Sequence, residues 1–133
     1  MTKILAFAKD TVLIDKSSVR LFGRKFYPIG QTNSYGYEFY LTLEENVNLC
    51  SEVVVQNMPE GLYATLRVRG IAGLSRGWYV LFSMVESAGY VPVGVCRQTY
   101  GWVTVGFEEI VNWQQQKGNS QDWVIDLWLQ LRE

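Results

Sequence analysis

Aromatic side chains are the residues through which this chain is most able to do chemistry. The 133-residue sequence holds five Trp, eight Tyr and six Phe, but no His. Aromatic rings combine apolar area with faces that attract cations, so a surplus of Tyr and Trp indicates a ligand pocket or an interface. A strand-rich core is the alternative, because strands favour the same residues. The lack of His excludes His-dependent catalytic triads and typical zinc sites, and we expect no metal and no cofactor.

The rings must be positioned by regular elements, and these are clearest in the middle of the chain. Pro59 and Gly61 predict a turn. The alternation of apolar and polar residues that follows predicts a half-buried strand over 62–69. A helix over 74–88, ended by Gly89, is predicted by five apolar residues at helical spacing: Leu74, Trp78, Leu81, Phe82 and Val85.

Further strands are predicted from the same alternation of side chains. Over Tyr35–Leu43, one face is almost wholly aromatic and carries Tyr35, Tyr37 and Phe39, whereas Glu38 lies on the other face. Strands are also predicted over four other segments: Val19–Ile29, Ser51–Gln56, Val93–Val103 and Trp123–Leu131.

Two segments have a less regular pattern. Residues 1–16 fit either a short helix through Asp10 or a strand over Thr11–Ile14. Residues 104–122 are rich in Gln, Asn and Gly, and we expect them to form a long connection with a short helix over Glu108–Gln116.

Length and charge limit the class of protein. A chain of 133 residues has room for one domain with one core. Its 12 Lys and Arg residues are balanced by 13 Asp and Glu and gather on no segment, so direct nucleic-acid binding is not expected. No signal-like or membrane-spanning segment is recognisable, which predicts a cytoplasmic protein with no membrane partner. In a reducing compartment, Cys50 and Cys96 are expected to be buried free thiols.

Several short motifs occur in a characteristic order from residue 50 onwards. They are the Pro-x-Gly-x-Tyr-Ala of Pro59, Gly61, Tyr63 and Ala64, the strand end Arg69-Gly70, the helix with Trp78 and Leu81, and its end at Gly89-Tyr90. In this order they resemble the GyrI-like effector-binding domain of bacterial multidrug-sensing transcription regulators, which also occurs as free-standing proteins. The resemblance implies an α+β fold, an antiparallel sheet with helices on one face, built from two strand-helix-strand-strand (SHS2-like) repeats around a ligand cleft.

The first half of the chain departs from that family. Upstream of Tyr35 there is too little chain for the usual first strand and a full-length first helix. We therefore interpret 1–133 as a single effector-binding-like domain with a degenerate first repeat over 1–49 and a second repeat over 50–133. Either residues 1–16 form a shortened element or a second copy of the chain covers the exposed sheet face, which would make a homodimer. No helix-turn-helix precedes the domain, so the chain resembles the sensor half of a regulator.

The resemblance also implies which residues face the cleft. In the family the strand after Pro92 carries Glu-x-Tyr with the acid in the cleft, and here Gln98 and Tyr100 hold those places. An amide lacks the attraction of a carboxylate for a cation. The candidate ligand-binding residues are Tyr35, Tyr37, Trp78, Phe82, Gln98, Tyr100, Trp102 and Trp128.

A carboxylate elsewhere in the chain would have to replace the missing acid. The candidates for this countercharge are Glu38, Glu108 and Glu109. Each of them is expected to be a solvated surface group, since unpaired Glu is rarely buried.

Three functions are compatible with these residues. The first is a small-molecule binding protein, not an enzyme, for hydrophobic aromatic or amphipathic compounds, cationic ones included. The second is a GyrI-like hydrolase of small electrophilic compounds that acts through a cleft Trp and Glu, which the Gln at position 98 and the lack of His disfavour. The third is a protein-binding inhibitor with an open apolar surface.

Overall fold

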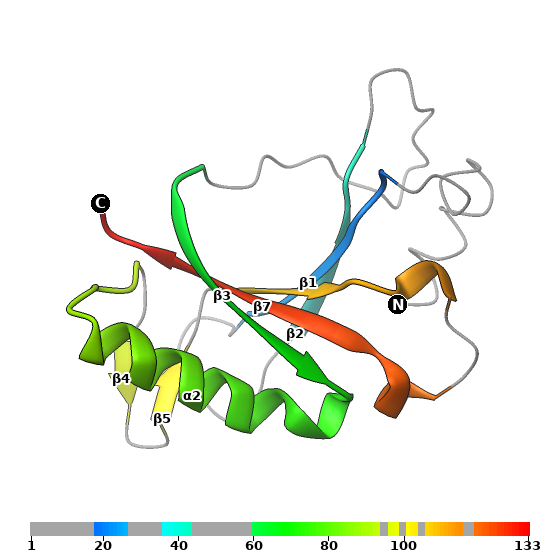
Figure 1. Ribbon diagram of the computed structural model, residues 1–133. Coiled ribbons are helices and arrows are strands. Elements are labelled where there is room, and N and C mark those ends of the chain that lie inside the picture. Colours follow the sequence, from blue (N-terminus) through cyan, green and yellow to red (C-terminus); the bar gives the residue numbers. More distant parts are fainter. Residues whose placement is uncertain are drawn as a thin grey trace.

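The central feature of the fold is an antiparallel sheet with the strand order β2-β1-β6-β7-β3, accompanied by the helix α2 (Figure 1). The computed structural model describes residues 18–26, 36–43, 60–93, 96–98, 101–103, 106–115 and 119–133. Every neighbouring pair of strands in this sheet is antiparallel, which confirms the expected α+β class.

The bounds of these elements are as follows. The strands of the sheet are β1 (Leu21–Phe26), β2 (Gly36–Leu41), β3 (Leu62–Arg69), β6 (Phe107–Ile110) and β7 (Val124–Leu131). A separate two-stranded sheet consists of β4 (Cys96–Gln98) and β5 (Gly101–Val103). The helices are α2 (Leu74–Ser87) and the short 3-10 helices η2 (Ile71–Gly73), η3 (Trp113–Gln115) and η4 (Ser120–Asp122).

The strand and helix predicted in the middle of the chain are confirmed. β3 has the expected bounds, and α2 ends one residue earlier than expected. Gly89 follows the helix with a φ of 84°, in the left-handed region that favours glycine. A Cβ at Gly77 would lie 2.6 Å from Cγ1 of Val68. Glycine at position 77 therefore allows α2 to lie directly against β3.

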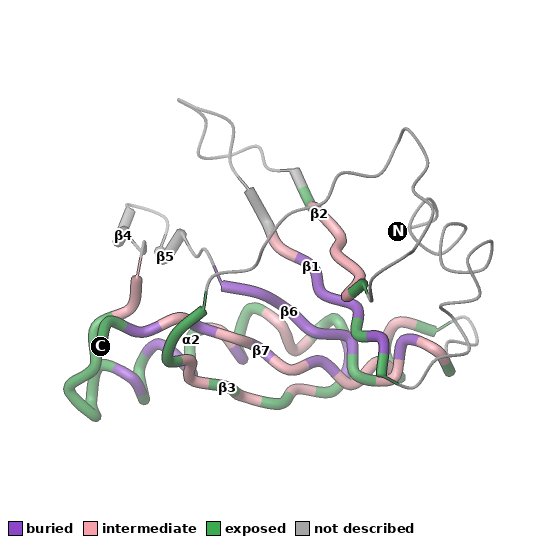
Figure 2. Tube along the Cα trace, turned by 90° about the horizontal axis from the view of Figure 1, so that it is seen from above, coloured by how far each residue is buried: buried purple, intermediate pink, exposed green. Residues whose placement is uncertain are grey.

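The core lies between α2 and one face of the sheet, the helix face, which carries Leu66, Ile110 and Leu127. Burial alternates along β7, where Leu127 and Leu129 are fully enclosed, and is complete along β6 (Figure 2). The side chains of α2 that pack here are Leu81, Phe82 and Val85. Each such side chain stabilises the fold by about 1.5–3 kcal/mol when it leaves water.

The opposite face of the sheet, the far face, carries Phe22, Phe107 and Trp128. Their rings meet edge to face: the centroid of Phe22 is 6.4 Å from that of Phe107 and 6.5 Å from that of Trp128. Tyr40 approaches Phe107 in the same way at 6.1 Å. These contacts join β2, β1, β6 and β7, and each ring pair contributes about 0.5–1.5 kcal/mol beyond its buried area.

Residues 104–122 differ from the expected connection with a helix over Glu108–Gln116. Phe107–Ile110 forms β6, an inner strand of the sheet, and within the expected helix only Trp113–Gln115 is helical. The expectation was wrong because β6 is paired on both sides, with β1 and with β7. Ladder hydrogen bonds and burial on both faces outweigh the preference of Glu for helices.

The expected single strand over Val93–Val103 is also wrong. Its described parts are β4 and β5, which pair antiparallel with each other and place Gln98 opposite Gly101 and Arg97 opposite Trp102. Gln98 and Trp102 therefore do not follow one another along a single strand. An alternating pattern cannot distinguish one long strand from two short ones that fold back on each other.

Some predictions fall outside the described residues. They concern the element over 1–16, the strand over Ser51–Gln56, the beginning of the aromatic strand at Tyr35, and the thiols of Cys50 and Cys96. In the part of the chain that the structure describes, no helix has the length and apolar character needed to cross a lipid bilayer.

Candidate functional site

Strand β6 carries two neighbouring carboxylates to opposite faces of the sheet. Glu108 shares the helix face with Ile110, and Glu109 shares the far face with Phe107. Glu108 is only 4% exposed and Glu109 only 7%. The expectation that both are solvated surface groups is therefore wrong, because donors from other strands and from α2 replace water around them.

Glu108 is bound by two aromatic donors. The hydroxyl group of Tyr37 donates to Oε1 at 2.8 Å, and the indole N–H of Trp78 donates to Oε2 at 3.3 Å. Among the residues whose side chains the structure describes, no Lys or Arg forms an ion pair with Glu108. Within this part of the chain the carboxylate thus has hydrogen bonds but no countercharge, and in a site of low dielectric it attracts an approaching cation strongly.

Two glycines bring these donors within reach of the carboxylate. A Cβ at Gly23 would lie 2.3 Å from Oη of Tyr37, and a Cβ at Gly106 would lie 2.4 Å from Cη2 of Trp78, both closer than the 3.0 Å that real contacts respect. The two rings therefore lie directly on backbone. A side chain at either position would displace the donor.

Two more rings lie beside the donors. The ring centroid of Phe82 is 6.0 Å from that of Trp78, one helical turn away, and the centroid of Phe39 is 4.9 Å from that of Tyr37. Phe82 is buried, whereas Tyr37 is 36% exposed. Tyr37, Trp78, Phe82 and Glu108 are called the Glu108 cluster below.

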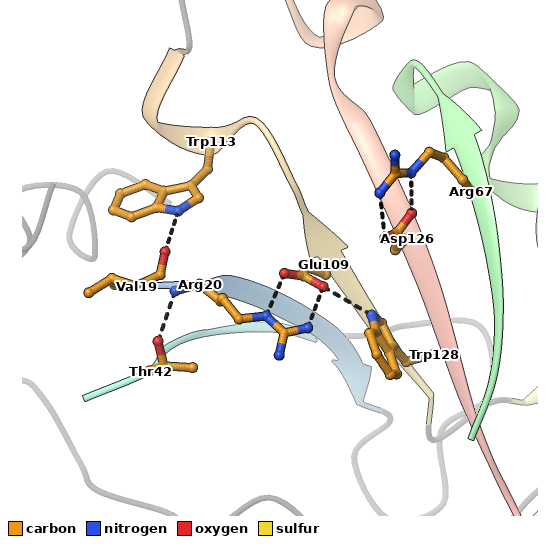
Figure 3. A network of polar contacts seen from close by, with 8 residues as sticks. All are labelled: Val19, Arg20, Thr42, Arg67, Glu109, Trp113, Asp126 and Trp128. Carbon is orange, nitrogen blue, oxygen red and sulfur yellow. Dashed lines mark hydrogen bonds and ion pairs between the residues drawn. The ribbon is translucent and has the colours of Figure 1, made fainter. Parts of the chain in front are cut away.

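Glu109 on the far face, unlike Glu108, has a cationic partner among the described residues (Figure 3). Arg20 donates from Nε and Nη2 to its two oxygens at 2.8 and 2.7 Å, and the indole N–H of Trp128 donates at 3.2 Å. The hydrogen bonds with Glu109 raise the pKa of Arg20 above its ordinary value, although partial burial acts in the opposite direction. A bidentate pair of this kind is satisfied within the protein and leaves no charge for a ligand.

Arginines also lie over the rings of the far face. The Cζ atom of Arg20 lies 4.9 Å from the ring centroid of Phe22, and the Cζ atom of Arg24 lies 5.5 Å from that of Phe107. An ion pair with Glu38 holds Arg24 there, with 3.6 Å between Nη2 of the arginine and Oε2 of the glutamate. The guanidinium groups and their stems shield both rings from water, and Phe22 and Phe107 are accordingly buried.

The structure brings three of the expected ligand-binding residues together around one expected countercharge: Tyr37, Trp78, Phe82 and Glu108. Trp128 and Glu38 do not join them, because the strand register places both on the far face. The side chains of Gln98 and Trp102 lie outside the described part of the chain, as do Tyr35 and Tyr100 entirely.

The burial of Glu108 and the roles of Gly23 and Gly106 were not foreseen from the sequence. A weak signal was present, because a strand over Phe107–Ile110 has one Glu and one apolar residue on each face. Four residues are too few for periodicity to separate strand from helix. The glycine contacts leave no signal, since they depend on rings that come from other elements.

The described residues contain no group of three or more His, Cys, Asp or Glu side chains that could hold a metal ion. No known protein family model matches the chain, and no curated protein is significantly similar to it.

Proposed function

We propose that this protein binds small aromatic or amphipathic molecules that carry a positive charge, with Glu108 as the countercharge. The rings of Tyr37 and Trp78 would provide the faces against which such a molecule stacks. The observation that carries the proposal is the buried carboxylate of Glu108, which is 4% exposed and lacks an ion pair among the described residues.

The energetic argument concerns this missing partner. Removal of an ionised carboxylate from water costs several kcal/mol. Hydrogen bonds from Tyr37 and Trp78 return about 1.5–3 kcal/mol each, which offsets much of this cost but neutralises none of the charge. A ligand with a delocalised charge would pair with the carboxylate of Glu108 and stack on the neighbouring rings at the same time.

The resemblance to GyrI-like effector-binding domains supports the same proposal. In that family an acid in the cleft attracts cationic ligands, and Gln98 stands at the matching position here. Glu108 would take over the role of that acid. The protein would then be a cytoplasmic ligand-binding module of the multidrug-sensing type, with any regulation of transcription exerted through a separate DNA-binding partner.

We also infer from the resemblance that the sheet consists of two SHS2-like repeats, the first of them shortened. If the separate β4–β5 pair between α2 and β6 is set aside, β3, α2, β6 and β7 follow the strand-helix-strand-strand order, and β1 and β2 would be the last two strands of the other repeat. Two ring contacts that would correspond in the two repeats support this inference. The ring centroids of Phe22 and Trp128 are 6.5 Å apart, those of Phe107 and Tyr40 are 6.1 Å apart, and both pairs meet edge to face.

A second function, hydrolysis of small electrophilic compounds, is favoured by one contact. The GyrI-like hydrolases that this chain resembles act through a Trp and a Glu in the cleft. Here the indole nitrogen of Trp78 lies 3.3 Å from Oε2 of Glu108. Glu108 would accept a proton from a water molecule as that water attacks the substrate. The chain has no His to assist, so we rank binding first.

Calorimetric titration with two flat aromatic dyes of matched shape, one cationic and one neutral, tests the binding proposal. The wild-type protein is expected to prefer the cationic dye. Glu108→Gln keeps the shape of the side chain and removes its charge, so this variant should lose the preference while it still binds the neutral dye. The control, Glu109→Gln, removes the neighbouring carboxylate on the far face and should leave the preference unchanged.

Failure of the wild-type protein to bind either dye would contradict the proposal. An equal loss of charge preference in both variants would show that Glu108 is not the countercharge. For the hydrolase, a small epoxide and a chromogenic ester are incubated with the wild-type protein and with Glu108→Gln. Turnover that is present in the first and absent in the second would favour the enzyme over the binding module.

A further inference from the structure

Strand β2 forms one edge of the sheet, and half of its backbone groups face away from β1. Among the described residues β2 pairs with β1 alone. The backbone N–H of Thr42 donates to the carbonyl oxygen of Arg20 at 3.0 Å, so Thr42 and every second residue before it face β1. The N–H and C=O groups of Tyr37, Phe39 and Leu41 therefore point outward.

The two edges of the sheet are protected to different degrees. β3, at the other edge, carries the exposed charges Arg67 and Arg69, with 63% of the Arg67 side chain accessible. Charged side chains oppose the pairing of edge strands. β2 has one charge, Glu38, which Arg24 holds at 3.6 Å. The rest of β2 is aromatic, aliphatic or glycine, so this edge is the one suited to pair with another strand.

We propose that β2 pairs with β2 of a second copy of this chain, antiparallel and about a two-fold axis at Phe39. In this register Phe39 lies opposite the partner's Phe39, and Tyr37 lies opposite the partner's Leu41. The outward-facing backbone groups of the two strands then meet in hydrogen-bonded pairs. A contact of this kind is closed and gives a dimer, not a filament. The proposal does not depend on the function of the Glu108 cluster.

Charge and hydrogen bonding select this register over its neighbours. With the axis at Phe39, Glu38 lies opposite the partner's Tyr40. A Tyr hydroxyl is a suitable neighbour for this carboxylate, since Tyr40 of the same chain already donates to Glu38. An axis at Glu38 would place two carboxylates directly opposite each other, which destabilises a strand pair. An axis at Tyr40 would pair fewer of the outward-facing groups within β2.

The dimer would complete the outer side of the Glu108 cluster. Tyr37 donates to Glu108 and is nevertheless 36% exposed. The partner's Leu41, directly opposite in the proposed register, would cover part of that ring. A second copy would thus hold the donor in place over Glu108.

Cysteine cross-linking tests the register. In a protein with Cys50→Ser and Cys96→Ser, the substitution Phe39→Cys places two thiols across the axis. Opposed residues of a hydrogen-bonded antiparallel pair have Cα atoms about 5.5 Å apart, which suits a disulfide. Mild oxidation should therefore convert Phe39→Cys to a covalent dimer. The matched control Thr42→Cys lies about 20 Å from its copy in this register and should remain uncross-linked.

Sedimentation velocity of the wild-type protein provides a second measurement that needs no substitution. The mass is expected to rise from that of the 15.3 kDa chain to twice that value as the protein concentration increases. Leu41→Lys, opposite the partner's Tyr37, should shift the equilibrium towards the monomer. A wild-type protein that stays monomeric at every concentration would overturn the proposal. Equal cross-linking of Thr42→Cys and Phe39→Cys would overturn it as well.

Discussion

Glu108 and Glu109 are adjacent in the sequence and are both buried, yet their surroundings differ in one respect. Glu109 receives a bidentate guanidinium from Arg20, whereas the donors that the described residues offer to Glu108 are the neutral groups of Tyr37 and Trp78. The difference follows from the alternation of a strand, which sends one side chain towards α2 and the other towards the far face. At the scale of single residues, the candidate site is therefore defined by Glu108, for which the described residues provide no cation, in contrast to Glu109.

The hydrogen bond from Tyr37 to Glu108 gives a prediction at this scale. Tyr37→Phe removes the donor and leaves Oε1 of a buried carboxylate unsatisfied, which should cost about 1–3 kcal/mol of the free energy of unfolding. Urea unfolding at neutral pH measures the loss. The control is Tyr40→Phe on the same strand, whose hydroxyl group binds the 37%-exposed Glu38, so that water can replace it. Equal losses in the two variants would contradict the assigned role of Tyr37.

At the scale of elements, the glycines decide how closely rings approach the sheet. The three atoms nearest to a Cβ at Gly23 all belong to Tyr37, a partly exposed side chain that can turn outward. A Cβ at Gly106 would lie 2.6 Å from the backbone oxygen of Trp128 as well as against Trp78. Backbone within a paired strand yields much less easily than a side chain at the surface.

We therefore expect Gly106→Ala to destabilise the fold by about 1–3 kcal/mol or more, and Gly23→Ala by less. Thermal and urea unfolding of both variants provide the comparison. In a double-mutant cycle, Gly23→Ala should lose most of its effect when Tyr37→Ala removes the ring that it displaces. The opposite ranking of the two glycine variants would mean that the approach of α2 to β6 tolerates a methyl group.

An element can be predicted from the sequence when the residues within it determine its structure, and less well when distant parts of the chain determine it. β3 and α2 were predicted closely because their periodicity extends over 8 and 14 residues, with turns or glycines at their ends. β6 was not predicted, because four residues with two Glu become a strand only when β1 and β7 lie on either side. The aromatic rings of the Glu108 cluster were foreseen as candidates. Their arrangement around Glu108 was not, since it depends on β2, α2 and β6 at once.

At the scale of the whole molecule, stability should depend on alkaline pH through Tyr63. Burial raises the pKa of Tyr63 above its ordinary value of 10.0. The unfolded chain then releases this proton at a lower pH than the folded protein does. The contribution of neutral Tyr63 to the free energy of unfolding is complete below the pKa of the unfolded state. It is lost as the pH rises through the pKa of the folded state.

Tyr63→Phe removes this titration. The unfolding midpoint of the wild-type protein should therefore fall more steeply above about pH 10 than that of Tyr63→Phe. Urea unfolding of both proteins, at neutral pH as the reference and at several alkaline values, measures the two slopes. Parallel curves would show that the surroundings of Tyr63, Trp128 among them at 6.0 Å between ring centroids, do not oppose its ionisation.

The pairing of β1 with β6 joins parts of the chain that are synthesised far apart in time. Arg20 and Glu109, which meet across this pair, are separated by 89 positions. A hairpin such as β1–β2 is marginal in water by itself, so it must wait for strands from the other end of the chain. Contacts of such long range slow folding, because the entropy of closing the loop is lost before the contacts form. The edge of β1 that later pairs with β6 therefore stays open until the second half of the chain has been made, and this is the stage at which a chaperone would matter most to the hairpin.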